Sequence, residues 1–505
     1  MTRVALIALY GPENIGLRTL AAHLRGQGHE TSLIFFKRWV NNNLQPPSPR
    51  ELALLRGVLA DLRPGLVGLS FTSPLLELAR TVTRTIRTSV TAPIVWGGLH
   101  AIARPRQCLA SCDFVCRGEG ERTLLALADH LDGHGSLEDV PGLAALLHGQ
   151  PFETPLAPLW PDLDTLPFPL YAQTEMYFLE HDRLRVGDPL LATRELRVLA
   201  SRGCPGTCAY CYNSMMKRLY PAKSWFRHKS VPRLIAELEH TLAQLPRVRL
   251  LKFDDDTFVF PKPWIEEFCT AYRSAIGLPF EILFDPNKHV LPRMAELRQA
   301  GLRRVQVGLQ TGSPRRAEQE YGRILRRSKV VAFAAMAKKA KLEVVYDLIV
   351  DDPTAVAADG RALVELLLDV PRPFDLFVYS LNYFPGTALT ERLLAEGLLE
   401  ESQVEGKAQK ALRQFRVTFD WPRPPDQQAL VALVSLTSKR FIPRALLRAL
   451  VHTSWPCRHP LLLLRCAEVS NSLKLCYIGF KMARQGHLSW EKLREYGLRG
   501  RILIQ

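Results

Sequence analysis

The sequence predicts an α/β protein in three parts: a parallel-sheet domain, a partial barrel of six strand-and-helix units, and a helical C-terminal region. Short apolar runs alternate with amphipathic stretches at the start of the chain, the alternation resumes after a proline-rich segment, and it stops near residue 400. Such alternation is typical of parallel strands joined by helices. We place the parts at residues 1–148, 195–400 and 401–505, with a linker at 149–194.

The first part is expected to form an open parallel sheet. Its strands are predicted at residues 4–9, 30–36, 66–71, 93–96 and 114–116, with helices at 16–28, 49–62, 74–87 and 121–131. Several of these strands end in small or polar residues. Ligands bind outside the carboxyl ends of the strands in such sheets, so these ends are the predicted ligand site.

The second part shows six further strand signals, and the third shows none. The strands are expected at residues 198–201, 248–253, 280–284, 304–309, 343–350 and 376–381. After these come leucine- and arginine-rich stretches of helical spacing, interrupted by prolines. The preceding segment, 149–194, is rich in proline and has no clean period, which favours a linker laid over the surface.

Composition excludes several classes of protein. Hydrophobic residues make up 47% of the chain, as in soluble globular proteins, and no stretch reaches the roughly 20 apolar residues that span a bilayer. The N-terminal apolar run is too short for a signal peptide and is expected to be a buried strand. Ten cysteines in 505 residues do not indicate a disulfide framework, so we expect a cytoplasmic, reducing location.

The net charge of +16 is concentrated near the C-terminus. Residues 431–505 contain 13 basic residues and three acidic ones. Such an excess indicates an anionic partner, whether membrane surface, nucleic acid or phosphorylated substrate, or serves solubility.

Three cysteines lie in one loop directly after a predicted strand. Residues 201–213 read Ser-Arg-Gly-Cys-Pro-Gly-Thr-Cys-Ala-Tyr-Cys-Tyr-Asn. Three thiolates from a short loop can hold three irons of a cubane and leave the fourth open to chelate a substrate. Pro205 and Gly206 let the loop turn, and Gly203 permits a close approach. The alternatives are buried thiols or a zinc site, but no fourth ligand accompanies the loop.

The spacing Cys-x3-Cys-x-aromatic-Cys resembles the signature of radical SAM enzymes. The resemblance implies that Cys204, Cys208 and Cys211 bind a [4Fe-4S] cluster, with Tyr210 as a cofactor contact. It also implies that S-adenosylmethionine (SAM) binds the open iron.

Later strand ends extend this resemblance. Residues 252–258, Lys-Phe-Asp-Asp-Asp-Thr-Phe, resemble the Phe-x-Asp-Asp-x-Phe of the cobalamin-associated branch, which implies that Asp254 or Asp255 accepts hydrogen bonds from the SAM ammonium. The alternative is an acidic turn that closes a strand. Residues 346–353 and 383–387 resemble the fifth- and sixth-strand signatures of the same branch.

The stretch at residues 307–313 resembles the Gly-x-Glu/Gln-Ser-Gly-Ser of the family. This implies SAM contacts from Gln310 and Thr311, and a bidentate clamp on the SAM carboxylate from Arg323. Arg323 also lies in a basic run and is equally explained as a surface residue.

The first part resembles a Rossmann-like cobalamin-binding domain. The resemblance rests on Gly-Gly-x-His at 97–100 and Cys-Arg-Gly-Glu-Gly-Glu at 116–121. Glycines let a flat corrin or a nucleotide tail lie against backbone, although ordinary strand-to-helix turns would explain them too. The implied contacts are Asn14, Ser70, Thr72, Ser73, Gly97, Gly98, His100, Gly118 and Glu119. The loop at 10–16 lacks the histidine that ligates cobalt in domains of methionine-synthase type.

The other cysteines are expected to be buried thiols. Cys108, Cys112 and Cys116 form a regular series that could suggest a second cluster, but helix and strand burial explains them more simply. Cys269, Cys457, Cys466 and Cys476 are interpreted in the same way.

The C-terminal region is basic and amphipathic. Arg444, Arg448 and Arg465 are interleaved with leucines, as in a helix that lies on an anionic membrane or covers a hydrophobic substrate. The alternative is a helical cap on an incomplete barrel. RNA binding is a third option, but no appended RNA-binding motif is present.

The combined motifs resemble cobalamin-dependent radical SAM enzymes. The resemblance implies a [4Fe-4S] cluster, SAM and cobalamin, an electron donor such as flavodoxin or ferredoxin, and a small-molecule or lipid-like substrate rather than nucleic acid. The leading hypothesis is a methyltransferase for an unactivated carbon, which uses a 5′-deoxyadenosyl radical and methylcobalamin. One alternative keeps the cofactors but performs cyclisation, rearrangement or oxidation. Another is a non-catalytic corrinoid- or cluster-binding sensor or carrier.

Overall fold

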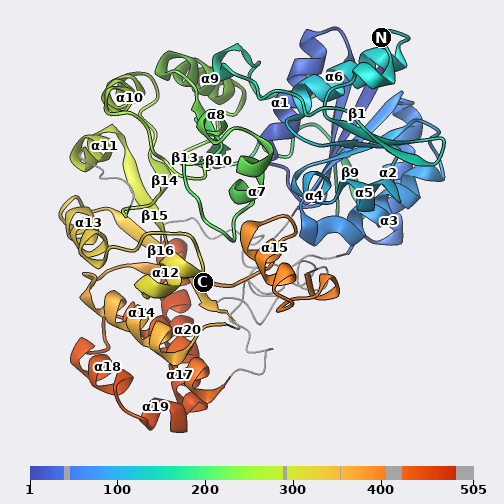
Figure 1. Cartoon of the computed structure of the whole chain (residues 1–505). Coiled ribbons are helices and arrows are strands. Elements are labelled where there is room, and N and C mark those ends of the chain that lie inside the picture. The colour runs from blue at the N-terminus through green and yellow to red at the C-terminus, as the bar shows by residue number, and fades with distance from the viewer. Residues whose placement is uncertain (39–45, 288–292, 353, 405–423, 485–505) are drawn as a thin grey trace. The chain divides into compact units, whose positions relative to one another are not determined.

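The computed structural model describes residues 1–38, 46–287, 293–352, 354–404 and 424–484 (Figure 1). The chain divides into two compact units. The first comprises Met1–Glu281, Gln299–Gly301 and Asn382–Leu412, and the second comprises Ile282–Arg298, Leu302–Leu381 and Arg413–Gln505. The boundaries at residues 148, 194 and 400 remain predictions.

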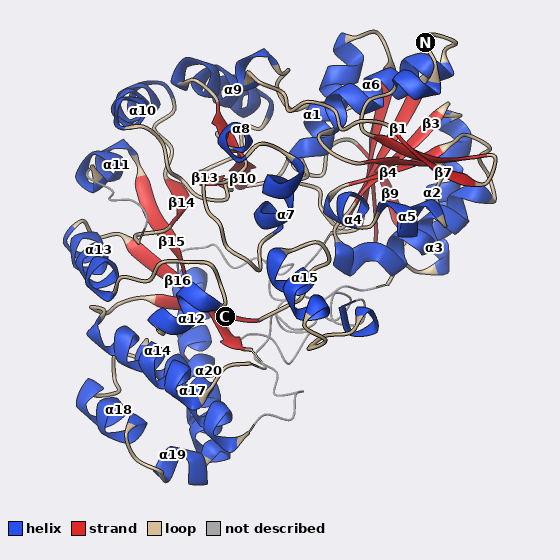
Figure 2. Cartoon of the chain, in the orientation of Figure 1, coloured by secondary structure: helices blue, strands red, loops and turns tan. Residues whose placement is uncertain are grey.

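The first unit contains a nine-stranded sheet in the order β7-β6-β5-β4-β3-β1-β2-β8-β9. Figure 2 draws its strands in red, with helices beside them in blue. β1 (Arg3–Leu9) lies between β2 (Glu30–Phe36) and β3 (Leu66–Ser70), and both neighbours run parallel to it. β4 (Ile94–Gly97) and β5 (Phe114–Cys116) continue the parallel part beyond β3. The five predicted strands are therefore present, and their carboxyl ends meet at one edge of the sheet.

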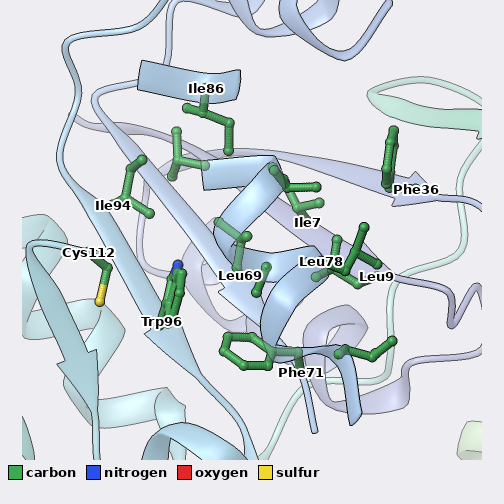
Figure 3. Packing of buried hydrophobic residues seen from close by; sticks show 14 of the residues in the cluster. Ile7, Leu9, Phe36, Leu69, Phe71, Leu78, Ile86, Ile94, Trp96 and Cys112 are labelled. Carbon is green, nitrogen blue, oxygen red and sulfur yellow. The ribbon is translucent and has the colours of Figure 1, made fainter. Parts of the chain in front are cut away.

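Apolar side chains cover both faces of this sheet. Ile7 and Leu9 belong to one core, part of which Figure 3 shows, while Leu6 and Ala8 belong to the core on the other face. Successive residues of a strand point to opposite faces, so the unbroken apolar run of β1 follows from burial on both sides. Trp96 lies in the first core, and its indole N–H donates to Thr83 Oγ1 at 3.0 Å.

Helices connect the parallel strands: α1 (Ile15–Gly26), α2 (Pro49–Leu62), α3 (Leu76–Arg87), α4 (Leu99–Ala103), α5 (Pro105–Leu109) and α6 (Gly120–Leu131). α1 begins after Asn14, whose side chain accepts a hydrogen bond from the backbone of Leu17 at 3.0 Å. α2 begins after Ser48, which forms a capping box with Glu51. These caps satisfy backbone N–H groups that have no partner within the helix.

The segment predicted as a linker contributes strands to the same sheet, which corrects that prediction. β6 (Leu143–Leu147), which ends before this segment, pairs antiparallel with β5, and β7 (Gln150–Glu153), within the segment, pairs antiparallel with β6. β8 (Met176–Glu180) joins β2 in parallel, and β9 (Arg183–Val186) follows it antiparallel. β7 and β9 are short edge strands with mostly exposed residues, so they lack the apolar alternation that reveals a strand.

The first unit also contains the start of the predicted strand-and-helix series. β10 (Glu195–Val198) and β13 (Leu250–Phe253) run parallel. Between them lie β11 (Ser201–Arg202), α7 (Tyr212–Leu219), α8 (Ala222–Trp225), β12 (Arg227–His228) and α9 (Val231–Gln244). α10 (Lys262–Ala275) follows β13, and α15 (Ala388–Ala395) also belongs to this unit.

The second unit contains the later strands and the C-terminal helices. β15 (Leu302–Gln310), β16 (Glu343–Asp351) and β17 (Asp375–Ser380) are parallel neighbours in chain order. β14 (Phe280–Phe284) and α11 (Met294–Ala300) include the positions where the chain passes between units. The helices are α12 (Pro314–Gln319), α13 (Arg327–Lys339), α14 (Ala357–Asp369), α17 (Pro425–Thr437), α18 (Arg444–Val451), α19 (Trp455–Arg458) and α20 (Pro460–Arg484). The predicted order is confirmed: a sheet domain, then alternating strands and helices, then helices alone.

The C-terminal helices pack within the second unit. α17 contacts both α14 and α20, and Leu463, Leu464 and Ala467 of α20 are buried. The described helices thus form the helical cap that was one of the alternatives for this region. In the described part of the chain, every helix is too short or too polar to cross a membrane.

Candidate functional site

A cavity of about 730 Å³ lies within the first unit. The carboxyl ends of β3 and β4 reach it through Ser70 and Gly97, and the loop after β1 reaches it through Asn14. Residues near the ends of β10 and β13, including Leu199 and Asp256, complete the wall. Its volume falls in the range of roughly 300–1,000 Å³ that is usual for small-molecule and cofactor sites.

The cavity brings together seven of the residues predicted to contact cofactors. They are Asn14, Ser70, Gly97, Gly98, Gly118, Glu119 and Asp254. Five other predicted contacts in the first unit are not among its lining residues: Thr72, Ser73, His100, Tyr210 and Asp255.

His100 is buried away from the cavity, beside Ser73. Its Nδ1 lies 2.9 Å from Ser73 Oγ, and its ring stacks on Phe71 with centroids 5.8 Å apart. Only 3% of His100 is exposed, and this burial lowers its pKa to about 4. His100 and Ser73 are thus buried against each other, and Thr72 is exposed. The predicted cofactor roles of these three residues receive no support from their positions.

The glycines at the cavity wall differ in what a side chain at each position would contact. Gly98 has φ 91°, and a Cβ there would lie 2.5 Å from the carbonyl oxygen of Phe71, so only glycine fits. At Gly118 a Cβ would lie 2.2 Å from the Tyr220 hydroxyl. At Gly97 the nearest atom to a Cβ is 3.7 Å away, an ordinary contact. Gly97 and Gly11 are half-buried and present backbone without a side chain to the cavity, which suits a corrin ring or its nucleotide tail.

The cysteine loop runs from β11 to α7. Cys204, Cys208 and Cys211 are all half-buried, and Cys211 is the N-cap of α7. The backbone N–H of Gly206 donates to Cys204 Sγ at 3.2 Å, and Asn213 Nδ2 donates to Cys211 Sγ at 3.5 Å. Burial raises the pKa of the Cys211 thiol to about 11, while the N–H groups of Asn213 oppose this shift. N–H donors and a helix N-terminus favour a sulfur that carries negative charge.

The three thiols suit a cluster better than a single ion. Among the described residues, no group of three His, Cys, Asp or Glu side chains is arranged around one metal position. In a cubane each thiolate binds a different iron, so the three sulfur atoms need not converge on one point. Gly203, predicted to approach the cluster, has its tight contact elsewhere: a Cβ would lie 2.2 Å from the carbonyl oxygen of Trp225.

The end of the motif at residues 383–387 and the first residues of α15 contact the cysteine loop and α7. The backbone N–H of Leu389 donates to Ala209 O at 2.8 Å, and that of Ala388 donates to Ser214 Oγ at 2.9 Å. Gly386 packs against Met215, where a Cβ would lie 2.5 Å from the sulfur. The start of α15 therefore packs on the cysteine loop and on α7, so the motif at residues 383–387 helps to hold that loop in place.

The three acidic residues after β13 have three different environments. Asp254 is half-exposed and pairs with Arg197 at 2.7 Å. Asp255 is 2% exposed and accepts hydrogen bonds from the backbone N–H of Ala200 at 3.0 Å and from the Ser201 hydroxyl. Burial raises the pKa of Asp255 to about 6, against these hydrogen bonds. Asp255 thus holds the segment before the cysteines in place.

Asp256 faces the cavity and was not among the predicted contacts. Its Oδ2 accepts hydrogen bonds from the Tyr212 hydroxyl at 2.6 Å and from Asn213 Nδ2 at 3.0 Å. Burial raises the pKa of Asp256 above its usual value. A signal for this residue was present in the sequence, because Phe253 and Phe258 align the two acids of Phe-x-Asp-Asp-x-Phe with Asp255 and Asp256.

An ion-pair network joins the residues after β5 to β11 and β12, the two strands that flank the cysteine loop. Arg202 Nη2 lies 2.5 Å from Glu121, which is 3% exposed, and Arg227 Nη2 lies 2.6 Å from Glu119. Burial alone would raise the pKa of Glu119, but the hydrogen bond from Arg227 and the charge of Arg202 hold it below its usual value. The predicted Gly-Glu-Gly-Glu motif therefore anchors the loop that carries Cys204.

The second unit contains the other three predicted SAM contacts. Gln310 ends β15 with φ 66°. Thr311, the next residue, is buried and lines a separate cavity of about 40 Å³ with residues of α14 and α17. Arg323 Nη2 donates to Asp285 Oδ2 at 2.9 Å and to Gly308 O at 2.5 Å. Arg323 is thus an ion-pair partner whose side chain is 10% exposed, rather than a fully exposed surface residue, and its SAM contact remains a prediction.

The remaining cysteines divide into two groups. Cys108, Cys112, Cys116 and Cys269 are buried, as predicted. Cys457 is half-buried, and Cys466 and Cys476 are exposed, so the prediction of burial was wrong for these three. Cys457 lies in α19, and Cys466 and Cys476 lie in α20.

Two family models match the chain. Residues 4–128 match the B12 binding domain, and residues 198–367 match the radical SAM superfamily. The chain belongs to the radical SAM proteins that carry a B12-binding domain. The predicted fold class and cofactor classes agree with both models.

Relatives of this B12-binding radical SAM protein have different names. The uncharacterized methyltransferase PH0819 of Pyrococcus horikoshii is 26% identical over 347 residues, which cover 68% of this chain and 72% of the relative. The anaerobic magnesium-protoporphyrin IX monomethyl ester cyclase of Synechocystis sp. is 27% identical over 259 residues, which cover 48% of each chain. Each name describes the activity given to that relative.

A solved structure has the same fold. The radical S-adenosylmethionine methyltransferase TsrM from Kitasatospora setae, solved with cobalamin and a [4Fe-4S] cluster, superposes with a TM-score of 0.62. The superposition covers 93% of this chain and 100% of that one at 15% identity.

Proposed function

We propose that this protein is a cobalamin-dependent radical SAM methyltransferase that methylates an unactivated carbon of a small molecule. One observation carries the proposal: the glycine-rich strand ends of the B12-binding domain and the residues beside the cysteine loop line the same cavity. A corrinoid on the first wall and SAM at the second would border one shared space. The methyltransferase name of the relative from Pyrococcus horikoshii supports the choice of reaction.

The residues of the chain have separate tasks in this scheme. Cys204, Cys208 and Cys211 would hold the cluster, and Gly11 and Gly97 would lie against the corrinoid. When bound, the reduced cluster supplies the electron that cleaves SAM, and the corrinoid supplies the methyl group. Asp254 and Asp256 both line the cavity. Asp256 is the better placed of the two to accept hydrogen bonds from the SAM ammonium, because its carboxylate is held beside the cysteine loop by Tyr212 and Asn213, whereas that of Asp254 pairs with Arg197. An external electron donor such as flavodoxin or ferredoxin is required.

A non-methylating radical reaction is the second candidate. It is favoured by the likeness to the anaerobic ester cyclase from Synechocystis sp., at an identity similar to that of the methyltransferase relative. The same cavity and cofactors would serve both reactions. A carrier or sensor that never cleaves SAM is the third possibility.

SAM cleavage and methyl transfer separate these candidates. The full chain would be purified anaerobically with hydroxocobalamin, reconstituted with iron and sulfide, and reduced in the presence of SAM labelled with a trideuterated methyl group. We expect 5′-deoxyadenosine from the wild type and none from the Cys204/Cys208/Cys211→Ala triple variant. The Cys108/Cys112→Ala double variant is the matched control, because these buried thiols lie outside the loop.

The product decides between the two reactions. Incubation with a fractionated small-molecule extract should give a product that is heavier by one trideuterated methyl group, together with S-adenosylhomocysteine. A new product without the label, formed with 5′-deoxyadenosine alone, would favour cyclisation, rearrangement or oxidation. No 5′-deoxyadenosine under any reducing condition would leave only the carrier or sensor.

A further inference from the structure

The side-chain amide of Asn213 has a defined orientation. Its Oδ1 accepts a hydrogen bond from the indole N–H of Trp225 at 2.6 Å. An indole nitrogen can only donate, so the atom that faces Trp225 has to be the amide oxygen. The amide nitrogen therefore points to the opposite side, and the orientation follows from the chemistry of the partner.

Both N–H groups of this amide then have acceptors. Asn213 Nδ2 lies 3.0 Å from Asp256 Oδ2 and 3.5 Å from Cys211 Sγ, a distance suited to an N–H donor and a sulfur acceptor. Asn213 is 2% exposed and Trp225 is 5% exposed, so water does not compete for the amide. The ring of Trp225 is held in turn by stacking on Tyr220, with centroids 6.2 Å apart.

We propose that Asn213 is a positioning residue that donates an N–H to the sulfur of Cys211 and thereby raises the reduction potential of the cluster. The inference rests on the proposed function, since it requires that Cys211 binds the cluster. Reduction adds negative charge that is shared by the cluster and its sulfur ligands. A fixed N–H donor stabilises the more negative state, as hydrogen bonds to the sulfurs of iron–sulfur clusters do.

This arrangement also connects the cluster to the cavity. The same amide nitrogen donates to Cys211 and to Asp256, and Asp256 lines the cavity. A ligand that engages Asp256 therefore acts on a residue whose amide also contacts a cluster thiolate. Trp225 keeps the amide from rotating when the ligand binds, because rotation would place an N–H against the indole N–H.

A potentiometric titration of the full-length reconstituted protein tests the proposal. The signal of the reduced cluster would be followed by electron paramagnetic resonance in the wild type, Asn213→Ala and Trp225→Phe, without substrate. We expect a more negative midpoint potential in Asn213→Ala, and a smaller shift in the same direction in Trp225→Phe, where the amide is present but no longer oriented. Iron and sulfide content, measured in parallel, should match the wild type.

Ser214→Ala is the matched control. Ser214 lies on the same helix, and its hydroxyl hydrogen bonds involve only backbone groups, including Cys211 O at 2.7 Å. Its loss should lower the thermal midpoint without moving the potential. If Asn213 only stabilised the fold, Asn213→Ala would likewise lower the thermal midpoint and leave the potential unchanged.

The outcomes are distinguishable. An unchanged potential in Asn213→Ala at full cluster content overturns the inference. If Asn213→Ala does not retain the cluster, Trp225→Phe decides: a negative shift bears the inference out, and an unchanged potential overturns it. Absence of a cluster in the wild type would contradict the proposed function itself.

Discussion

The hydroxyl of Tyr212 donates a hydrogen bond to Asp256 Oδ2 across 2.6 Å. Tyr212 is the first residue of α7, directly after Cys211, and Asp256 lies just beyond β13, 44 residues later in the chain. This one contact ties the cysteine loop to the end of a barrel strand. Because Asp256 also lines the cavity, the contact links the place where a cluster would bind to the wall that a ligand would touch.

Asp256→Ala should destabilise the cysteine loop. The change removes the acceptor of the Tyr212 hydroxyl and of one Asn213 N–H. The Asn213 amide is buried, and a buried donor without an acceptor costs about 1–3 kcal/mol. We expect a lower thermal midpoint and a lower iron content after reconstitution. Asp254→Ala is the control, because Asp254 forms a half-exposed pair with Arg197 whose loss costs little. Equal effects of the two changes would contradict this assignment.

Gly98→Ala should disrupt the first unit, whereas Gly97→Ala should leave it folded. Gly98 has φ 91°, and a Cβ added there would lie 2.5 Å from a backbone oxygen. A Cβ added at Gly97 would have its nearest neighbouring atom 3.7 Å away. Strain of this kind in a left-handed conformation typically costs about 1–3 kcal/mol before the clash is added. Soluble yield and thermal midpoint measure the difference. If Gly97→Ala then weakens corrinoid binding in a folded protein, the bare backbone at Gly97 serves the cofactor.

Arg202→Met should cost more stability than the double change Arg202→Met with Glu121→Gln. The single change leaves a carboxylate that is 3% exposed without its cation, and loss of one partner of a buried pair typically costs about 3–5 kcal/mol. Neutralising Glu121 removes that penalty. Thermal unfolding of the four proteins in the cycle gives the coupling, and simple additivity of the two single changes would show that the pair is not coupled. The half-exposed pair Arg197–Asp254 serves as the reference cycle.

Asp347 should make the protein less stable as the pH rises from about 4 to 7. Its carboxylate is buried and held by the neutral amide of Gln306 at 2.8 and 3.0 Å, and burial raises its pKa to about 7. The pKa of an aspartate in the unfolded chain is about 3.9. Between pH ~4 and ~7 the folded protein therefore keeps a proton on Asp347 that the unfolded chain has lost. The stabilisation is complete below pH ~4 and is lost as the pH passes ~7, at about 1.4 kcal/mol per pH unit for this group.

Asp347→Asn should remove this part of the pH dependence, because an amide keeps an acceptor for Gln306 and does not titrate. The thermal midpoint of the wild type minus that of the variant should fall across this pH range. Asp369→Asn is the control, since that carboxylate pairs with Arg448 at 2.9 Å nearer to the surface. A difference that is flat with pH would show that Asp347 does not carry the effect.

Much of the local structure could be predicted from the sequence. The five parallel strands, the strand-and-helix series and the helical C-terminal region follow from apolar periodicity, which each segment carries on its own. The linker prediction failed because edge strands such as β7 and β9 bury little and show no period. The prediction that the cysteines of α19 and α20 are buried was wrong. Whether a helix face is buried depends on which other elements pack on it, and no local sequence pattern specifies those neighbours.

The residue types at the site could be predicted from the sequence, but the directions in which their side chains point could not. Gln310 and Thr311 are consecutive, yet Thr311 lines a separate small cavity among helices. His100 and Gly97 share one motif, yet only Gly97 reaches the large cavity. Neighbouring residues at a strand end point to different sides, so a motif names a position without saying which side chain faces the ligand.

The sequence by itself determined the chemistry available to this protein: three thiolates in one loop, glycines at strand ends, and acids after a strand. Those features depend on spacing within a few residues. Only the tertiary structure decided that Asp256 faces the cavity while Asp255 anchors Ser201, and that Trp225 orients Asn213 toward Cys211. These relations join segments that are distant in the chain, and their geometry is set by strand register and core packing.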